Sequence, residues 1–516
     1  MAVGEGIQVD PSGGGVRRRT GVRGVWRRAR VLAVRAPWAL PTLLAAVLRL
    51  WGIGEAPLGV DEGASLWFAA WDVGELWDRL PATEQHPPLY YAMLGLWLRW
   101  GDTEAHVRLL SALFSIATVP AAWALARAVC GRRAAGWAAW LMAAAPFAIA
   151  QGRWARMYGL LGFEAAVALW GCAWILKGAR AAGPWIGYGV AAAAVPYTHN
   201  LGVLIFAAAN AAWLVAPRRV AWRSWLALQA AVLAVWSFWA PGWLEQAAAV
   251  QGRFWIPPPS PGWVSAGLLD LSGGLAHFAP LRGPFGAAEI VATVGAFAAT
   301  GAMLTGVWVG RKDRVRLAVL AAGIFVAPAC ALAATVVKPV FLARTLAWIL
   351  APAAAAAGLG LARAGPRARW ALVAAIGIGH ALSFHAQISR PPDEPFDEVA
   401  RYIAERTVPE DAVIFVTPLG QPAFDYYFRH YGLPRAEYGV PWSMAERGAR
   451  EPPMTAEASA QLAARLEPHP RVWLVRTGAS RYVDPERRTE AMLRQIGRCE
   501  SRVKRGQLEV SLYRRE

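Results

Sequence analysis

Long apolar runs, separated by short polar stretches, dominate the first three quarters of the chain. The runs are close to 20 residues each, the length that a helix needs to cross roughly 30 Å of hydrocarbon at about 1.5 Å per residue. This pattern predicts a polytopic α-helical membrane protein with about 11 transmembrane helices. They are expected at about 37–53, 108–130, 134–150, 159–176, 184–199, 200–216, 224–240, 288–309, 316–336, 343–362 and 370–388.

The stretch between the first two predicted spans, residues 54–107, is unusually long and is not plain coil. From Leu66 to Leu80, apolar residues recur every three or four positions with charged residues between them, which predicts one amphipathic helix lying in the headgroup plane. The apolar piece 89–100 is too short to span and is expected to lie against the membrane or dip into it. A tilted span extending to residue 107 would move every later basic loop outside, so that alternative is rejected.

The pattern changes beyond residue 389. Helical periodicity at 396–406, 421–431 and 485–496 alternates with strand-like runs at 412–417, 471–476 and 508–513. The chain is therefore expected to comprise a basic tail (1–36), a transmembrane domain (37–389) and a C-terminal α/β domain (390–516) large enough for its own core. Within the transmembrane domain, the Pro/Gly-rich stretch 241–287 predicts a partly ordered cover over the outer face.

Composition and charge support this reading and fix an orientation. Hydrophobic residues make up 56% of the chain and charged residues only 17%, which excludes a soluble globular protein. Of the net charge of +18, residues 390–516 contribute almost nothing, with 20 basic and 19 acidic side chains. The excess lies in the tail and in alternate short loops, which predicts a cytoplasmic N-terminus and an extracytoplasmic C-terminal domain in a plasma (inner) membrane. The same distribution argues against a nucleic-acid partner.

The first external loop holds the residues best suited to chemistry. Asp61 and Glu62 form an adjacent carboxylate pair, which is ordinarily solvated surface but at a membrane interface suits general-base work. His86 precedes two prolines, so it either caps the next helix or faces the same cavity as Asp61, with Tyr90 and Tyr91 lining that cavity.

Cations on the predicted outer side run against the charge trend of the loops. They are Arg153, Arg156, Lys338 and Arg344. They either snorkel to lipid headgroups or bind an anionic phosphate near the outer leaflet. His199, between the fifth and sixth predicted spans, is the weakest candidate for the same cavity.

Taken in order, these motifs resemble a known family. Val60-Asp61-Glu62, His86-Pro87-Pro88-Leu89-Tyr90-Tyr91, Ala155-Arg156-Met157-Tyr158-Gly159-Leu160, Thr198-His199-Asn200 and Lys338-Pro339-Val340-Phe341 before Arg344 are similar to motifs of the GT-C glycosyltransferases, bacterial family 39, of the protein O-mannosyltransferase and aminoarabinose-transferase type. Each motif alone is weak, whereas their order over residues 35–390 is specific.

The resemblance implies a transferase that takes a sugar from a polyprenyl-phosphate donor on the extracytoplasmic side and inverts the anomeric configuration. It implies that Asp61 is the catalytic base, with Glu62 orienting the loop. It places Arg156, Tyr158, Lys338 and Arg344 on the donor phosphate. The acceptor, whether protein, lipid or glycan, is left open.

One departure from the family pattern concerns a second carboxylate. Members commonly carry an acidic residue two positions before the arginine of the Arg-Met-Tyr motif, where this chain has Trp154. No cofactor is implied with certainty, and a divalent metal stays open. Glu164 either substitutes for the missing carboxylate or pairs with an arginine for structure.

A transporter or flippase of an anionic lipid-linked substrate is the alternative function, since external arginines and a central cavity suit it too. The spans show no evident inverted repeat and no paired broken helices in corresponding halves of the chain, which is against transport.

Overall fold

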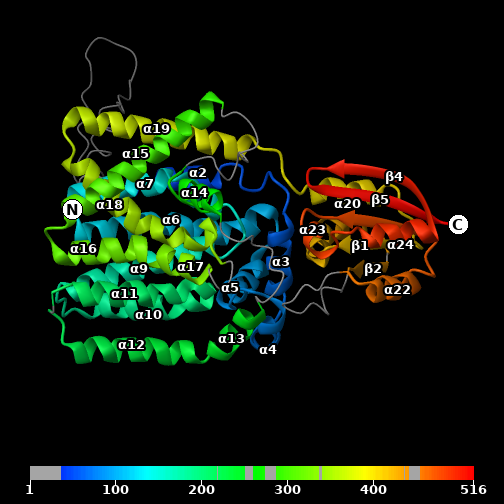
Figure 1. Ribbon diagram of the computed structural model, residues 1–516, viewed down its shortest axis with the longest axis horizontal. Coiled ribbons are helices and arrows are strands. Elements are labelled where there is room, and N and C mark those ends of the chain that lie inside the picture. The colour runs from blue at the N-terminus through cyan, green and yellow to red at the C-terminus, as the bar shows by residue number, and fades with distance from the viewer. Residues whose placement is uncertain are drawn as a thin grey trace, which may run out of the picture.

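The computed structural model describes residues 36–217, 219–249, 260–273, 286–335, 340–434, 436–440 and 454–516. A bundle of helices occupies one end of the long axis, and a smaller sheet-containing part occupies the other (Figure 1). Most of the basic tail 1–36 lies outside the described residues, as does Lys338. The predicted cover at 241–287 is described only in part, and the boundaries of the predicted domains stay predictions.

The bundle contains helical counterparts of all the predicted spans. It consists of α2 (Ala39–Leu50), α6 (Glu104–Val129), α7 (Arg132–Ala144), α8 (Pro146–Gly152), α9 (Tyr158–Leu176), α10 (Ala182–Thr198), η2 (Asn200–Val203), α11 (Leu204–Val215), α12 (Trp222–Ser237), α13 (Ala240–Ala249), α14 (Pro261–Leu271), α15 (Ala287–Gly310), α16 (Arg314–Ala321), η3 (Ala322–Val326), α17 (Ala327–Thr335), η4 (Ala343–Ile349), α18 (Leu350–Arg363) and α19 (Pro366–Ser389).

Six of the described helical segments are long and apolar enough to cross a membrane, or up to eight if each bent pair counts as one span. The bends are 55° between α7 and α8 and 65° between α12 and α13. The protein is thus a multi-pass membrane protein, while the number of 11 spans stays a prediction.

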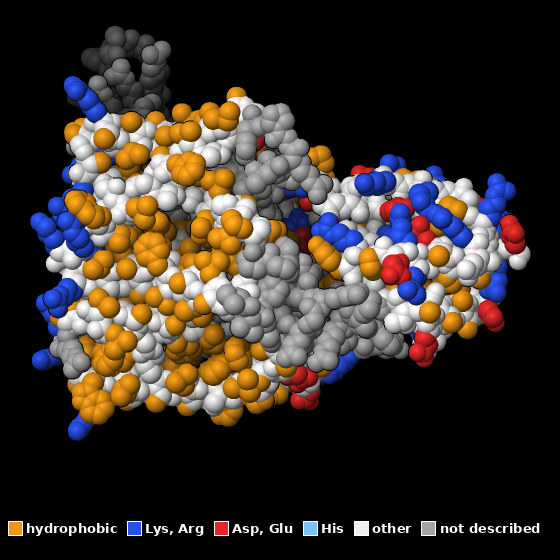
Figure 2. Space-filling view, viewed as in Figure 1, with side chains coloured by type: hydrophobic (Ala, Val, Ile, Leu, Met, Phe, Trp, Pro, Cys, Tyr) orange, Lys and Arg blue, Asp and Glu red, His pale blue; other side chains and the backbone are white. Residues whose placement is uncertain are grey.

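Small residues allow the central helices to approach closely. A Cβ on Gly360 of α18 would lie 2.1 Å from the Ala302 carbonyl oxygen of α15, and one on Gly358 would lie 2.4 Å from the Ala134 carbonyl oxygen of α7. Backbone contact through Gly and Ala is how helices associate in lipid, where apolar burial drives little. Outward-facing positions such as Phe297 are exposed and apolar, and Figure 2 shows hydrophobic side chains over the flank of the bundle.

Three short helices lie between the bundle and the C-terminal part: α3 (Val60–Ala69), α4 (Val73–Thr83) and α5 (Leu89–Trp97), the last followed by η1 (Leu98–Trp100) (Figure 1). The predicted single helix from Leu66 to Leu80 was wrong, because α3 ends at Ala69 and α4 starts anew. Asp72 Oδ1 accepts the Glu75 N–H at 2.8 Å and Glu75 Oε2 accepts the Asp72 N–H at 3.3 Å. This capping box begins a second helix.

The C-terminal part is α/β, as predicted. Its five-stranded sheet has the order β2-β1-β3-β5-β4, with β1 parallel to β2 and β3, and β5 antiparallel to β3 and β4. Its elements are α20 (Phe396–Ala404), β1 (Ala412–Val416), η5 (Pro418–Gly420), α21 (Gln421–Phe428), η6 (Arg429–Tyr431), β2 (Ala436–Gly439), α22 (Ala456–Arg465), β3 (Arg471–Arg476), α23 (Ser480–Val483), α24 (Arg488–Ile496), β4 (Gly497–Arg505) and β5 (Leu508–Arg515).

The strands β1, β3 and β5 were predicted from the sequence, whereas β2, α22 and β4 were not. The strand β4 alternates between exposed and half-buried residues and carries five charged side chains, so it has no apolar face to reveal it. The strand β4 is an edge strand of the sheet. Charged side chains are common on edge strands because they discourage pairing with other chains.

Candidate active site

The first turn of α3 separates the adjacent carboxylates. The helix begins at Val60 after extended Gly59, which places Asp61 and Glu62 at its N-terminal end, where the helix dipole favours negative charge. The Glu62 side chain is 3% exposed, whereas the Asp61 side chain is 38% exposed. Glu62 is therefore buried inside the protein, whereas Asp61 is accessible to a ligand.

Glu62 is held by four hydrogen bonds. Its Oε1 accepts from Arg108 Nε at 2.8 Å and from the Ala155 N–H at 3.0 Å. Its Oε2 accepts from Arg108 Nη2 at 2.7 Å and from the Gly59 N–H at 3.3 Å. Arg108 also donates to three backbone carbonyls within residues 53–57. These contacts fix the Glu62 side chain in place, and its carboxylate has little capacity left for a substrate.

Asp61 faces a cation supported by aromatic rings. Its Oδ2 lies 3.6 Å from Arg344 Nη1 of η4. The Arg344 guanidinium lies 5.4 Å from the ring centroid of Trp154, and Trp154 is stacked on Tyr158 with centroids 6.2 Å apart. The Trp154 ring thus serves as a platform for the Arg344 guanidinium.

Arg156 is the buried cation of the site. Its Nη1 donates to the Asp61 carbonyl oxygen at 3.2 Å, to Ser65 Oγ at 3.4 Å and to the Tyr91 hydroxyl at 3.5 Å. Its Nη2 lies 3.1 Å from His86 Nδ1. The buried Nε has no hydrogen-bond partner in the described part of the chain. A buried donor without an acceptor is costly, so this group is suited to an anionic ligand.

Two histidines from separate elements meet beside Arg156. His86 Nδ1 lies 2.7 Å from Glu84 Oε1, and the His86 ring contacts the His199 ring edge-on with centroids 5.4 Å apart. Burial and the charge of Arg156 lower the pKa of His86 despite Glu84, so the imidazole is neutral near pH 7. His199 Nε2 is buried without a partner among the described residues.

The residues that support this loop were not predicted from the sequence. Glu84 is buried and contacts His86 directly. Its position two residues before His86 is the one sign of this contact in the sequence. Gln246 of α13 donates to the carbonyl oxygens of Glu84 and His86 at 2.9 and 3.1 Å, and Asn200 donates to that of Gln85 at 2.8 Å. Nothing local in the sequence signals Gln246, because its partners lie some 160 residues away.

Some of the remaining predicted residues lie in this cluster and others lie outside it. Tyr91 and Tyr158 are in the cluster, whereas the Tyr90 hydroxyl is 2.7 Å from Ser111 Oγ and joins α5 to α6. Glu164, the suggested substitute carboxylate, accepts a hydrogen bond from Thr198 Oγ1 at 3.1 Å. Among the residues that the structure describes, no group of three or more His, Cys, Asp or Glu side chains could hold a metal ion.

Comparison with known proteins gives structural neighbours only. No protein-family model matches the chain, and no curated protein matches its sequence. The structure is similar to ArnT from Cupriavidus metallidurans in the apo state, with a TM-score of 0.58 and 14% identity over 95% of this chain and 98% of that chain.

ArnT bound to undecaprenyl phosphate gives a TM-score of 0.57 and 15% identity over the same shares of the two chains. The archaeal oligosaccharyltransferase AglB from Archaeoglobus fulgidus, in complex with an inhibitory peptide and a dolichol-phosphate, gives 0.52 and 12% over 92% of this chain and 73% of that one. The chain has the GT-C fold of these membrane proteins.

Proposed function

We propose that the protein is a membrane glycosyltransferase that moves a sugar from a polyprenyl-phosphate donor to an acceptor with inversion. The observation that carries this proposal is one cluster in which the half-exposed Asp61 carboxylate lies 3.6 Å from Arg344, while Arg156 donates to the Asp61 backbone carbonyl. An inverting displacement needs these two charges: a base on the acceptor side and positive charge for the departing phosphate.

Asp61 takes the proton of the acceptor group as that group attacks the anomeric carbon from the face opposite the phosphate. The bond between the anomeric carbon and the phosphate oxygen breaks, and the polyprenyl phosphate leaves with the electron pair. Arg344 and the Nε of Arg156, which has no hydrogen-bond partner among the described residues, stabilise the charge on that phosphate. Since phosphate is a good leaving group, no general acid is required.

The structural neighbours support the choice of donor. ArnT was solved with undecaprenyl phosphate and AglB with a dolichol-phosphate, so this fold accommodates a polyprenyl phosphate in both. His86, Tyr91 and His199 border the same cluster and are proposed to line the substrate cavity. Lys338, whose surroundings lie outside the described residues, keeps its proposed role on the phosphate.

The decisive experiment is Asp61→Asn in proteoliposomes supplied with undecaprenyl-phosphate-linked sugars and membrane acceptors. Removing a general base lowers transfer by about 10²- to 10⁴-fold, and binding of undecaprenyl phosphate should persist because the cations remain. Asp313→Asn, at the opposite end of the bundle, is the matched control. Full activity of Asp61→Asn would falsify the base assignment.

The sidedness is part of the proposal. The C-terminal part and the α3–α5 layer are placed outside the cytoplasm, with the N-terminus inside. A thiol reagent that cannot cross the membrane should label Cys499, which is half-buried in β4, in intact cells. Labelling of Cys499 only after permeabilisation would reverse this orientation.

Transport of an anionic lipid-linked substrate is less well supported. It gives no task to the exposed carboxylate of Asp61, nor to the anchoring of its helix through Glu62 and Arg108.

A further inference from the structure

The C-terminal part contacts the helix that carries the proposed base. We propose that Glu394 and Tyr427 are positioning residues that hold the first turn of α3, so that transfer depends on docking of the C-terminal part. This inference rests on the proposed function. It goes beyond it by giving the C-terminal part a role in the chemical step itself.

Three consecutive backbone N–H groups lead into α3, and each is bonded by a side chain. The Leu58 N–H donates to the Tyr427 hydroxyl at 2.7 Å, and the Val60 N–H donates to Glu394 Oε2 at 2.8 Å. Between them, the Gly59 N–H donates to Glu62 Oε2 at 3.3 Å. The first N–H groups of a helix have no partner within it, so these bonds decide how the turn is held. Two of the three acceptors come from the C-terminal part, which begins more than 300 residues later.

The helix α3 and the C-terminal part lie so close together that no side chain fits between them at Gly63 or Gly59. Gly63 of α3 faces α21, and a Cβ at Gly63 would lie 2.5 Å from the backbone nitrogen of Ala423. A Cβ at Gly59 would lie 2.9 Å from Glu394 Oε2. The backbone of α3 therefore lies directly against the C-terminal part, with no layer of side chains to absorb a shift.

A second contact fixes the C-terminal part at a distance from α3. Arg429 Nη2 lies 2.7 Å from Asp102 Oδ2, and the Tyr426 hydroxyl donates to the Asp102 carbonyl oxygen at 2.8 Å. Asp102 belongs to the connection between α5 and α6. Attachment at two separate points resists rotation of α21 about α3.

The position of Asp61 makes this hold relevant to chemistry. Asp61 directly follows Val60, so a movement of the turn displaces its carboxylate relative to Arg344, 3.6 Å away. A misplacement of about 1 Å in a reacting group can cost on the order of 10²-fold in rate. Glu62 and Arg108 hold the inner side of the turn, whereas Glu394 and Tyr427 hold the side that faces the C-terminal part.

The charge state of Glu394 offers an independent readout. Burial raises the pKa of the Glu394 carboxyl to about 7, against the hydrogen bond from Val60, and Asp61, Asp393 and Glu62 act in the same direction as burial. Each of these three acidic groups is paired: Asp61 with Arg344, Asp393 with Arg390, and Glu62 with Arg108. Above pH 7 the carboxylate is ionised and its bond to the Val60 N–H is the stronger, charge-assisted kind.

The test compares four variants in proteoliposomes, with transfer rate and binding of undecaprenyl phosphate measured separately. Glu394→Ala should lower kcat by about tenfold or more while the affinity for undecaprenyl phosphate stays unchanged. Tyr427→Phe, which removes the acceptor for Leu58, should lower kcat in the same way. Glu394→Gln keeps an oxygen that can accept from Val60, so it should retain most of kcat. Glu405→Ala, at an exposed ion pair of the same part, should match the wild type.

The pH profile separates positioning from a merely structural contribution. Because a neutral side-chain oxygen still accepts from Val60, the wild type should gain only the small part of kcat that Glu394→Gln lacks as pH rises through about 7, the pKa of Glu394, and Glu394→Gln should show no such step. Wild-type kcat in both Glu394→Ala and Tyr427→Phe, with Asp61→Asn inactive, would overturn the positioning role and leave the proposed function standing. Activity in Asp61→Asn would overturn the proposed function itself. Unfolding temperatures of all variants identify any that fail to fold.

Discussion

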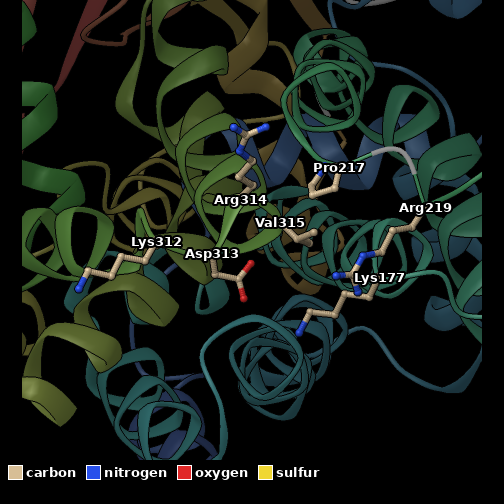
Figure 3. A pocket seen from close by; sticks show the side chains of 7 residues that line it. All are labelled: Lys177, Pro217, Arg219, Lys312, Asp313, Arg314 and Val315. Carbon is tan, nitrogen blue, oxygen red and sulfur yellow. The ribbon is translucent and has the colours of Figure 1, made fainter.

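The two ends of the helical bundle gather cations under opposite conditions. At the end covered by α3, α4 and α5, Arg108 and Arg156 are buried, and between them they donate to backbone carbonyls, hydroxyls and a carboxylate. At the other end, cations from three separate connections surround an open cavity of about 660 Å³ (Figure 3). The cations that line it are Lys177, Arg219, Lys312 and Arg314.

The difference shows what burial adds to a charge. A buried arginine bonded on several sides has one position, and its field acts at short range in surroundings of low dielectric. An exposed lysine or arginine moves among conformers and is screened by salt within about 10 Å. The first arrangement suits catalysis, whereas the second suits the orientation of the protein in the membrane. The sequence presents both as arginines near the ends of apolar runs.

The largest effect should come from the buried ion pair. Arg108→Met leaves Glu62 charged and buried without its partner, which should lower the free energy of unfolding by about 3 to 5 kcal/mol. Chemical denaturation in detergent measures this loss. Arg127→Met, at the exposed far end of the same helix α6, is the control and should change little. Equal losses in the two variants would remove the distinction between the ends.

An intermediate effect is expected at the ligand-facing cation. Arg344→Ala removes a charged donor worth about 1.5 to 3 kcal/mol, so the affinity for undecaprenyl phosphate should fall by about tenfold to a hundredfold. Equilibrium binding in detergent measures it. Arg344→Lys should recover only part of this affinity, because a lysine keeps the charge but lacks the planar guanidinium that lies over the Trp154 ring. Arg311→Ala, an exposed cation stacked on Trp308 at the opposite end, should bind as the wild type does.

The smallest effect is expected at the open cavity. The double variant Arg219→Ala and Lys312→Ala removes two exposed charges, each worth about 0 to 1 kcal/mol, and should leave the transfer rate within about twofold of the wild type. The comparison is made in proteoliposomes at low and physiological ionic strength. A loss as large as that of Arg344→Ala would mean that the basic end takes part in transfer.

Sequence reasoning did well where neighbours along the chain carry the information. Apolar runs of suitable length located the helices of the bundle except α13 and α14, which lie in the predicted cover, and alternating patterns located β1, β3 and β5. Predictions from the sequence failed where a few residues interrupt or conceal a pattern. The capping box of Asp72 and Glu75 divides a stretch whose apolar spacing is continuous, and the charges of β4 conceal a strand.

The amino-acid sequence by itself determined the membrane class, the order of the motifs and the choice of Asp61, Arg156 and Arg344 as candidates. These rest on local patterns and on residue chemistry. Only the tertiary structure decided that Glu62 points inward while Asp61 stays accessible, and that Trp154 supports Arg344. It alone joined Glu394 to Val60, since a partner 334 residues away is set by the packing of two parts of the chain and leaves no local pattern.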